Sequence, residues 1–217
     1  CSSPFWHGDN TGLKSYRLTI FDNLPRTGLP AEFKSYAEYQ RHIQILINAG
    51  VMEDSTKIWW DLRPSARYPT LETRIMDVCT RMDDAISLAA LLVSTIRMLY
   101  RLRLKNQRWR DYSPMLIREN RWRAMRYSFD EGLIDFGIGS IVPFEQLLDE
   151  FIDLTFEDAK SLGCESEVAA TKNILSRGTS AHRQLKTYKL SIDAGQNHED
   201  ALKDVVDMLI SETAEGL

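Results

Sequence analysis

The chain of 217 residues is 43% hydrophobic and 27% charged, with a net charge of −4. This is the composition of a folded protein rather than a disordered chain, and it provides no overall positive field to attract nucleic acid. Three scattered cysteines without a C-x-x-C pair disfavour a zinc site or a disulfide framework and favour a reducing compartment, so with no signal peptide we expect a cytoplasmic protein.

The amino-terminal part of the chain changes from loops to a helix. Residues 1–34 show no sustained periodicity, and we expect an ordered, loop-rich segment with one helical piece near residues 14–23. Ser35 and Glu38 have the spacing of a capping box, in which each side chain accepts a hydrogen bond from the other residue's backbone amide. Apolar residues then recur at helical spacing until Gly50, which suits the position just after a helix.

Two strand-like runs follow this helix. Residues 57–63 are rich in β-forming side chains and stop at Pro64, and residues 70–78 alternate between two faces. The short link between the runs suits a connection between adjacent strands. Because an isolated two-stranded piece is only marginally stable in water, we expect further strands of this sheet to lie upstream of the chain.

The remainder of the chain has a helical pattern. Apolar residues recur every three to four positions from a start capped by Asp83 or Asp84 to about residue 106. The apolar part of this run, residues 85–99, is too short to span a bilayer and is interrupted by polar residues, so we expect a buried helix and no membrane partner. We expect further helices over residues 114–128, 143–161, 165–190 with a break near Gly178, and 198–213, and a hairpin over residues 133–142 with Gly137 and Gly139 at its turn. The sequence therefore predicts an α+β protein with little sheet and much helix.

Glu72 and Arg74 are the pair in which the strand pattern points to chemistry. A spacing of two on a strand places both side chains on one face, about 7 Å apart along the backbone. A carboxylate beside a guanidinium can hold Mg²⁺ and a phosphate oxygen together, as phosphoryl transfer from ATP requires. The alternative is an ordinary Glu–Arg pair on a solvated sheet face, which the local sequence alone favours.

Two other arginines are candidates for binding a substrate. Arg63 closes the first strand-like run, where its fork would suit a carboxylate or phosphate; the alternative is an arginine stacked on Trp60 or Tyr68. Residues 3–12 are dense in glycine and small polar residues and could wrap a substrate, with Arg17 as the carboxylate anchor. The P-loop, H-E-x-x-H and G-x-S-x-G motifs are absent from the sequence.

Residues 97–126 contain nine arginines and one lysine with interleaved aromatic residues. This is the one feature of the chain that is typical of nucleic-acid binding. The alternative is a pair of helices whose arginines face solvent or the acidic carboxyl-terminal helices. Because the chain is acidic overall, we favour the alternative and expect no nucleic-acid partner.

Several segments match known sequence blocks in order along nearly the whole chain. Residues 2–12 are S-S-P-F-W-H-G-D-N-T-G, followed by Tyr16-Arg17; residues 60–65 are W-D-L-R-P-S; and residues 68–79 are Y-P-T-L-E-T-R-I-M-D-V-C. The later segments are R-W-R-A-M-R at 121–126 and R-G-T-S-A-H-R-Q at 177–184. Together they resemble the blocks of the glutamate–cysteine ligase type 2 family.

This resemblance implies a glutamine-synthetase-like catalytic fold, in which a curved antiparallel sheet forms a funnel and of which this chain would hold part. It implies an ATP-dependent carboxylate–amine ligase: ATP phosphorylates a substrate carboxylate, and an amine attacks the acyl phosphate to give a γ-glutamyl type amide. By resemblance, Glu72 would be a Mg²⁺ ligand and Arg74 would stabilise the transferred phosphoryl group. Arg17 would anchor the amino-acid substrate, and Arg63 would line the nucleotide or substrate site.

The resemblance does not include the family's amino-terminal part, which carries acidic metal ligands and an H-V-H motif, and the chain begins with Cys1 rather than Met. We therefore expect residues 1–217 to form the carboxyl-terminal part of a single catalytic domain. Its expected partners are the missing amino-terminal part, the amino-acid substrate, the amine acceptor and, in a homo-oligomer, further copies. Because Mg²⁺ prefers several oxygen ligands, we expect the chain alone to be inactive or nearly so. The alternative function is that of a non-catalytic interaction module using the helical half.

Overall fold

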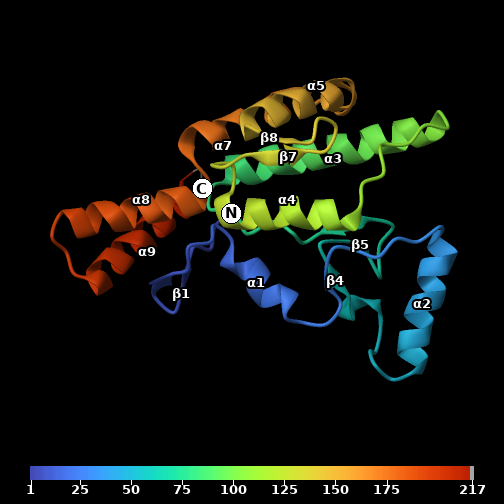
Figure 1. The fold of residues 1–217 in the computed structure, drawn as a ribbon, viewed down its shortest axis with the longest axis horizontal. Coiled ribbons are helices and arrows are strands. Elements are labelled where there is room, and N and C mark those ends of the chain that lie inside the picture. The colour runs from blue at the N-terminus through green and yellow to red at the C-terminus, as the bar shows by residue number, and fades with distance from the viewer. Residues whose placement is uncertain (216–217) are drawn as a thin grey trace. The chain divides into compact units, whose positions relative to one another are not determined.

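The computed structural model describes residues 1–215 and confirms an α+β protein with much helix and short strands (Figure 1). The chain forms two compact units. The smaller unit comprises residues 17–77, and the larger comprises residues 1–16 together with the residues from Val78 onward.

The smaller unit has one long helix and two pairs of short strands. Strands β3 and β4 pair in parallel, and strands β5 and β6 pair antiparallel with Arg63 opposite Glu72. The core of the unit is formed by Tyr39 and Ile43 of the long helix with Met52 and Ile58. In chain order its elements are α1 (Tyr16–Asp22), β3 (Thr27–Gly28), α2 (Tyr36–Asn48), a 3-10 turn (Ser55–Lys57), β4 (Trp59–Trp60), β5 (Leu62–Pro64) and β6 (Leu71–Thr73).

Helix α2 begins and ends where the sequence predicts. The Ser35 side chain accepts a hydrogen bond from the Glu38 amide at 3.2 Å, so Ser35 is the N-cap residue. The return bond of the expected capping box is different, because the Glu38 carboxylate accepts from the amide of Lys34 at 2.6 Å. Gly50 follows the C-cap with a φ of +69°, a left-handed conformation that glycine adopts without strain.

The two strand predictions were too long. The expected strand over residues 57–63 is divided at Asp61, because the chain changes partner there. Before it, β4 pairs with β3, and the Asp61 amide donates to the Gly28 carbonyl at 2.8 Å; after it, β5 pairs with β6. The Asp61 carbonyl accepts from the Arg74 amide at 2.8 Å. That bond closes the β5–β6 ladder, so the expected strand over residues 70–78 is limited to Leu71–Thr73.

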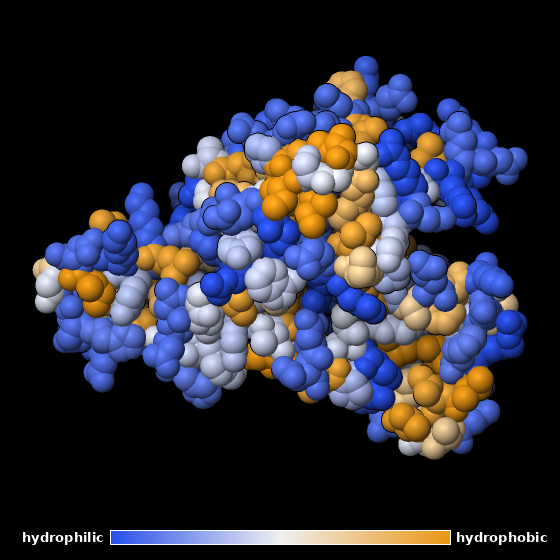
Figure 2. All heavy atoms as spheres, in the orientation of Figure 1, coloured by the Kyte–Doolittle hydropathy of each residue, from blue (hydrophilic) through white to orange (hydrophobic). Residues whose placement is uncertain are grey.

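The larger unit is mainly helical. Helix α3 packs against α5 and α6, with Ala90, Ala159 and Val168 in the core between them, and α8 packs against α9. The hairpin predicted over residues 133–142 is confirmed by the pairing of β7 with β8. Hydrophobic surface gathers over this region in Figure 2. Ile138 and Ile141 of the hairpin are exposed. The elements of the unit are β1 (Phe5–Trp6), β2 (Asp9–Asn10), α3 (Met82–Leu104), α4 (Pro114–Tyr127), β7 (Leu133–Asp135), β8 (Ser140–Val142), α5 (Phe144–Leu162), α6 (Glu165–Ala169), α7 (Lys172–Arg177), α8 (Ser180–Asp193) and α9 (His198–Ala214).

Three expectations for these helices were wrong in detail. Helix α3 begins after Arg81 rather than at an aspartate cap, because Asp84 points inward and pairs with Arg177. The expected helix over residues 165–190 has a second break, at Ala170–Thr171, before the expected one at Gly178. The expectation of a buried helix too short to span a bilayer was also wrong: α3 has 23 residues, by length and mean hydropathy it could cross a membrane, a test that a core helix also passes, and several of its large apolar side chains are exposed.

Candidate active site

The four residues singled out from the sequence form one continuous set of contacts within the smaller unit. Arg63 donates from Nη2 to Oε2 of Glu72 at 2.8 Å and from Nε to the same oxygen at 3.0 Å. The other carboxylate oxygen, Oε1, lies 2.6 Å from Nη2 of Arg74. Arg17 donates from Nη2 to the backbone carbonyl of Arg74 at 3.0 Å. Residues far apart in the sequence thus converge on one carboxylate and its neighbouring guanidinium groups.

The β5–β6 register explains why Arg63 and Glu72 meet. They are directly opposite each other in the ladder, so their side chains leave the same face and lie within reach of one another. Arg74 is one residue beyond β6, yet its backbone amide is held by Asp61. Glu72 and Arg74 do lie on the same side, as expected, because their side chains form an ion pair. The strand itself, however, ends at Thr73, between them.

Arg63 is the most constrained member of this set. The residue is 8% exposed, and besides Glu72 it donates from Nη1 to the carbonyls of Thr56, at 2.9 Å, and Ile58. All three of its nitrogen atoms therefore have acceptors within the chain. The sequence had placed Arg63 at the wall of a nucleotide or substrate site, whereas its fork in this structure fixes the carboxylate of Glu72.

Arg74 has a guanidinium nitrogen without an acceptor in the part of the chain that the structure describes, and Arg17 lies next to it. The Nε of Arg74 is buried and has no hydrogen-bond acceptor within residues 1–215, and a buried donor of this kind costs stability unless something accepts from it. Arg17 lies over the ring of Phe21 at 4.5 Å, and its Nη1 is 3.9 Å from the carboxylate of Asp77. A phosphate or carboxylate oxygen beside Arg74 would complete its hydrogen bonding.

The described residues do not by themselves fit Mg²⁺. Both oxygens of Glu72 are already engaged by Arg63 and Arg74, and residues 1–215 hold no cluster of three or more acidic, histidine or cysteine side chains that could bind a metal. Because Mg²⁺ binds through several oxygen ligands in near-octahedral geometry, Glu72 could supply one position at most. The fit of this site is to an anion.

Asp77 is a site residue to which the sequence analysis gave no role. Its side chain is 2% exposed and faces Arg17. Its place in the same block as Glu72 and Arg74, three residues after Arg74, is a signal that could have drawn attention to it.

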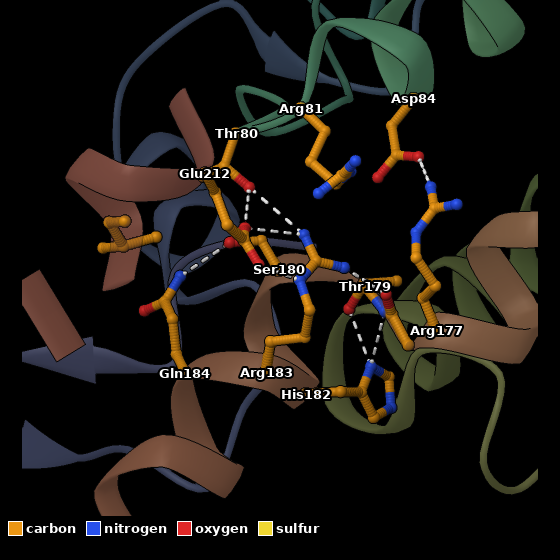
Figure 3. Close-up of polar contacts among 12 residues, drawn as sticks. Thr80, Arg81, Asp84, Arg177, Thr179, Ser180, His182, Arg183, Gln184 and Glu212 are labelled. Atoms are coloured by element: carbon orange, nitrogen blue, oxygen red, sulfur yellow. Dashed lines mark hydrogen bonds and ion pairs between the residues drawn. The ribbon is translucent and has the colours of Figure 1, made fainter. Parts of the chain in front are cut away.

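A second polar cluster lies in the larger unit, around residues 177–184 (Figure 3). The carboxylate of Glu212 in α9 receives hydrogen bonds from Arg183 and from the hydroxyl of Thr80, the latter at 2.7 Å. Arg183 also donates to the carbonyl of Gly178. Burial opposes ionisation of Glu212, but the hydrogen bonds from Arg183 and Thr80 outweigh it and lower the pKa of its carboxyl. This network ties α8 and α9 to the segment that precedes α3.

His182 belongs to the same cluster and caps α8. Its Nδ1 accepts from the amide of Thr179 at 3.2 Å, so Nε2 carries the proton that is shared with Asp130 at 2.9 Å. The ring stacks on Phe129, with 4.5 Å between centroids. Burial lowers the pKa of His182, although its hydrogen bond to Asp130 acts in the opposite direction. The bond from Thr179 thus selects the tautomer with the proton on Nε2, and burial disfavours the charged ring.

The arginine-rich stretch makes many contacts within the chain. Arg97 and Arg101 both pair with Asp158 of α5, which is 2% exposed. Arg123 donates to the carbonyls of the loop before β7, and Arg126 donates to the carbonyl of Gly12 at 2.8 Å. These contacts favour the structural explanation over nucleic-acid binding.

Known proteins are similar to this chain along nearly its whole length. The sequence model of glutamate–cysteine ligase family 2 matches residues 1–208. A protein of Rhodospirillum rubrum named "putative glutamate–cysteine ligase 2" is 57% identical over 98% of this chain and 54% of its own length. Proteins with the same name from Jannaschia sp. and Solibacter usitatus are 56% and 41% identical, over 97% and 100% of this chain and 56% and 54% of their own lengths. The chain spans about half the length of the curated relatives it matches. It belongs to glutamate–cysteine ligase family 2.

Proposed function

We propose that this chain forms part of an ATP-dependent carboxylate–amine ligase that joins the side-chain carboxylate of glutamate to an amine through an acyl phosphate. Family membership and the names of the relatives support the ligase class. The observation that carries the proposal is the convergence of Arg17, Glu72 and Arg74 in one network whose buried donor on Arg74 lacks an acceptor within the described chain.

Each residue of the network has a role in this proposal that follows from its contacts. Arg63 fixes Glu72, and Glu72 orients the guanidinium of Arg74 by its 2.6 Å ion pair. Arg74 then presents its Nε–H to the phosphoryl group, where a preorganised cation stabilises charge that is spread over the transferred oxygens. Arg17, next to Arg74, is placed to bind the substrate carboxylate.

Mg²⁺ belongs to the proposal only together with ligands beyond this chain. When bound, Mg²⁺ would supply charge neutralisation at the phosphates, and Glu72 is the carboxylate of this chain that would help to hold it, beside its ion pair with Arg74. Because the described residues offer no further cluster of ligands, we propose that the chain alone turns over ATP slowly or not at all. Three cysteines without disulfides are consistent with a cytoplasmic location, which is part of the same proposal.

Phosphate release tests this function. The Rhodospirillum rubrum relative should release phosphate from ATP only when both glutamate and an amine acceptor such as cysteine are present, and replacing the arginine equivalent to Arg74 by alanine should abolish the release. The 217-residue chain should show none. Robust turnover by the chain alone, or an unchanged rate in the arginine variant, would contradict the proposal.

One observation favours the second candidate function, a non-catalytic interaction module. Helix α3 exposes large apolar side chains, among them Val93 and Tyr100. Replacing the glutamate equivalent to Glu72 by alanine in the Rhodospirillum rubrum relative separates the two functions, because its ligase activity should be lost while an interaction through α3 should be unaffected.

A further inference from the structure

Helix α3 departs from the usual pattern of a helix on the surface of a folded unit, because many of its large apolar side chains are exposed. Its buried residues, on the side packed against α5 and α6, are mostly small or polar: Asp84, Ser87, Ala90 and Ser94, together with Met98. An amphipathic helix normally buries its apolar face and exposes its polar one. The apolar face of α3 must therefore be accounted for elsewhere.

That face is a continuous apolar stripe. We use the name outer stripe for the α3 residues that recur every three to four positions along it: Met82, Ile86, Ala89, Val93, Ile96, Tyr100 and Leu104. Of these, Met82, Ile86, Val93, Tyr100 and Leu104 are between 47% and 69% exposed. Since burial contributes about 25 cal/mol for each Å² of apolar surface, leaving such a stripe in water forgoes several side chains' worth of stabilisation.

The length of the relatives indicates what covers the outer stripe. Each curated relative described above has just under half of its chain outside the segment that matches residues 1–217. A surface on the same polypeptide is present at an effective concentration of about millimolar, which a separate protein molecule at ordinary concentrations does not reach. A covalently linked partner is therefore favoured over a second copy.

The charges around the outer stripe disfavour a membrane surface. Asp83 lies in the first turn of α3 beside the stripe, and the chain has a net charge of −4. Helices that lie on membranes instead combine an apolar face with a polar face rich in lysine and arginine. Two arginines of α3, Arg97 and Arg101, are already paired with the buried carboxylate of Asp158 in α5.

We propose that the outer stripe of α3 is the surface on which the remainder of the family protein, the part outside residues 1–217, packs. Its contact surface would be apolar and complementary to seven residues spread over about six turns of helix. This assignment is independent of the proposed chemistry, because none of the stripe residues lies in the network around Glu72 and Arg74.

Co-expression of two pieces tests the assignment. The 217-residue chain would be expressed with a tagged piece comprising the part of the Rhodospirillum rubrum relative that lies outside the match, and the chain retained by affinity capture would be quantified. Wild-type chain should be retained at a one-to-one ratio. Val93→Asp and, separately, Ile86→Asp should lower retention at least tenfold. Val206→Asp, at a 53% exposed position in α9, is the matched control and should be retained like wild type.

A labelling experiment covers the case in which the aspartate variants are misfolded. In Val93→Cys, the new thiol should react readily with a maleimide in the chain alone and at least tenfold more slowly in the complex, as followed by mass spectrometry of the peptide. Failure of wild-type chain to form the complex, equal retention of the aspartate variants, or unchanged labelling of Cys at position 93 would overturn the proposal. The proposal would also be overturned if the chain alone formed a stable dimer, or bound anionic lipid vesicles, and Val93→Asp abolished that dimer or that binding.

Discussion

Arg63 and Glu72 face each other across the β5–β6 ladder, and both Nε and Nη2 of the arginine donate to a single oxygen of the carboxylate, at 3.0 and 2.8 Å. The second carboxylate oxygen is thereby left for Arg74. The two arginines therefore differ: every nitrogen of the Arg63 guanidinium has an acceptor within the chain, whereas the Nε of Arg74 has none within residues 1–215.

Replacing Arg63 by methionine should destabilise the chain. Removing one partner of a buried pair costs about 3–5 kcal/mol, but Glu72 is 39% exposed and water would partly compensate its charge, so we expect about 1–3 kcal/mol. Urea unfolding followed by tryptophan fluorescence would measure this. Arg108→Met, which removes an exposed pair with Asp111, is the control and should change the free energy of unfolding by less than about 0.5 kcal/mol. Equal effects of the two changes would contradict the structural role of Arg63.

Replacing the arginine equivalent to Arg74 by lysine in the Rhodospirillum rubrum relative should lower kcat about 100-fold to 1000-fold, the usual effect of removing one preorganised donor to a developing anion. Lysine keeps the charge but loses the Nε–H and the fork. Because Arg74 is partly exposed, the melting temperature should change little. Initial rates of phosphate release would measure the effect, with the exposed Arg67→Lys as a control. A higher KM with an unchanged kcat would instead show that this arginine contributes to binding of the substrate in the ground state.

The stability of the chain should fall as the pH falls below about 6.5. Burial lowers the pKa of folded His182 below its ordinary value of 6.5, so the unfolded state takes up the proton first, and the stability that depends on neutral His182 is lost as the pH falls through the unfolded pKa. Protonation would also remove Nδ1 as the acceptor for the Thr179 amide. Urea unfolding at several pH values between 7.5 and 5 would measure how steeply the free energy of unfolding falls with pH.

His182→Gln should flatten this slope, and the exposed His42→Gln should leave it unchanged. The pKa of Asp130 is also lowered, because hydrogen bonds from Lys14 and His182 outweigh the effect of burial. Its contribution is lost only at lower pH, around and below 3.8, and does not overlap the window of His182. An identical pH slope in His182→Gln and wild type would exclude this role.

Replacing Glu212 by alanine should loosen the end of α9. The change leaves Arg183 and Thr80 without their shared acceptor, and we expect a loss of about 2–3 kcal/mol, the cost of leaving donors to a charged group unpaired. Hydrogen exchange should speed up over the last turns of α9 and the segment before α3. Glu199→Ala, in the first turn of the same helix, should leave exchange at that end unchanged.

The sequence predicts this structure best where the information is local. The start of α2 at Ser35, the turn after it at Gly50, and the hairpin with Gly139 were all predictable from residue types with a defined backbone preference. The division of the strands at Asp61 was not, because it depends on a partner strand, β3, that precedes it by some thirty residues. The inward pairing of Asp84 with Arg177 likewise depends on distant segments.

The candidate site was predictable in membership but not in geometry. The E-x-R spacing placed Glu72 beside Arg74, and the structure confirms their contact. The sequence could not show that all hydrogen-bond donors of Arg63 would be engaged by Glu72 and by backbone carbonyls. Those carbonyls belong to the 3-10 turn and the residue after it, and their position depends on the folded chain. Nor did it assign a role to Asp77, whose burial against Arg17 is a tertiary contact.

Trapping with hydroxylamine tests the central claim most directly. Hydroxylamine attacks an acyl phosphate, so the Rhodospirillum rubrum relative incubated with ATP, Mg²⁺ and glutamate should form γ-glutamyl hydroxamate without any added amine acceptor. The variant with lysine at the position of Arg74 should form at least 100-fold less, in line with the loss of one preorganised donor. Absence of hydroxamate from the wild-type protein, or equal amounts from the variant, would contradict the assignment of this site to acyl-phosphate chemistry.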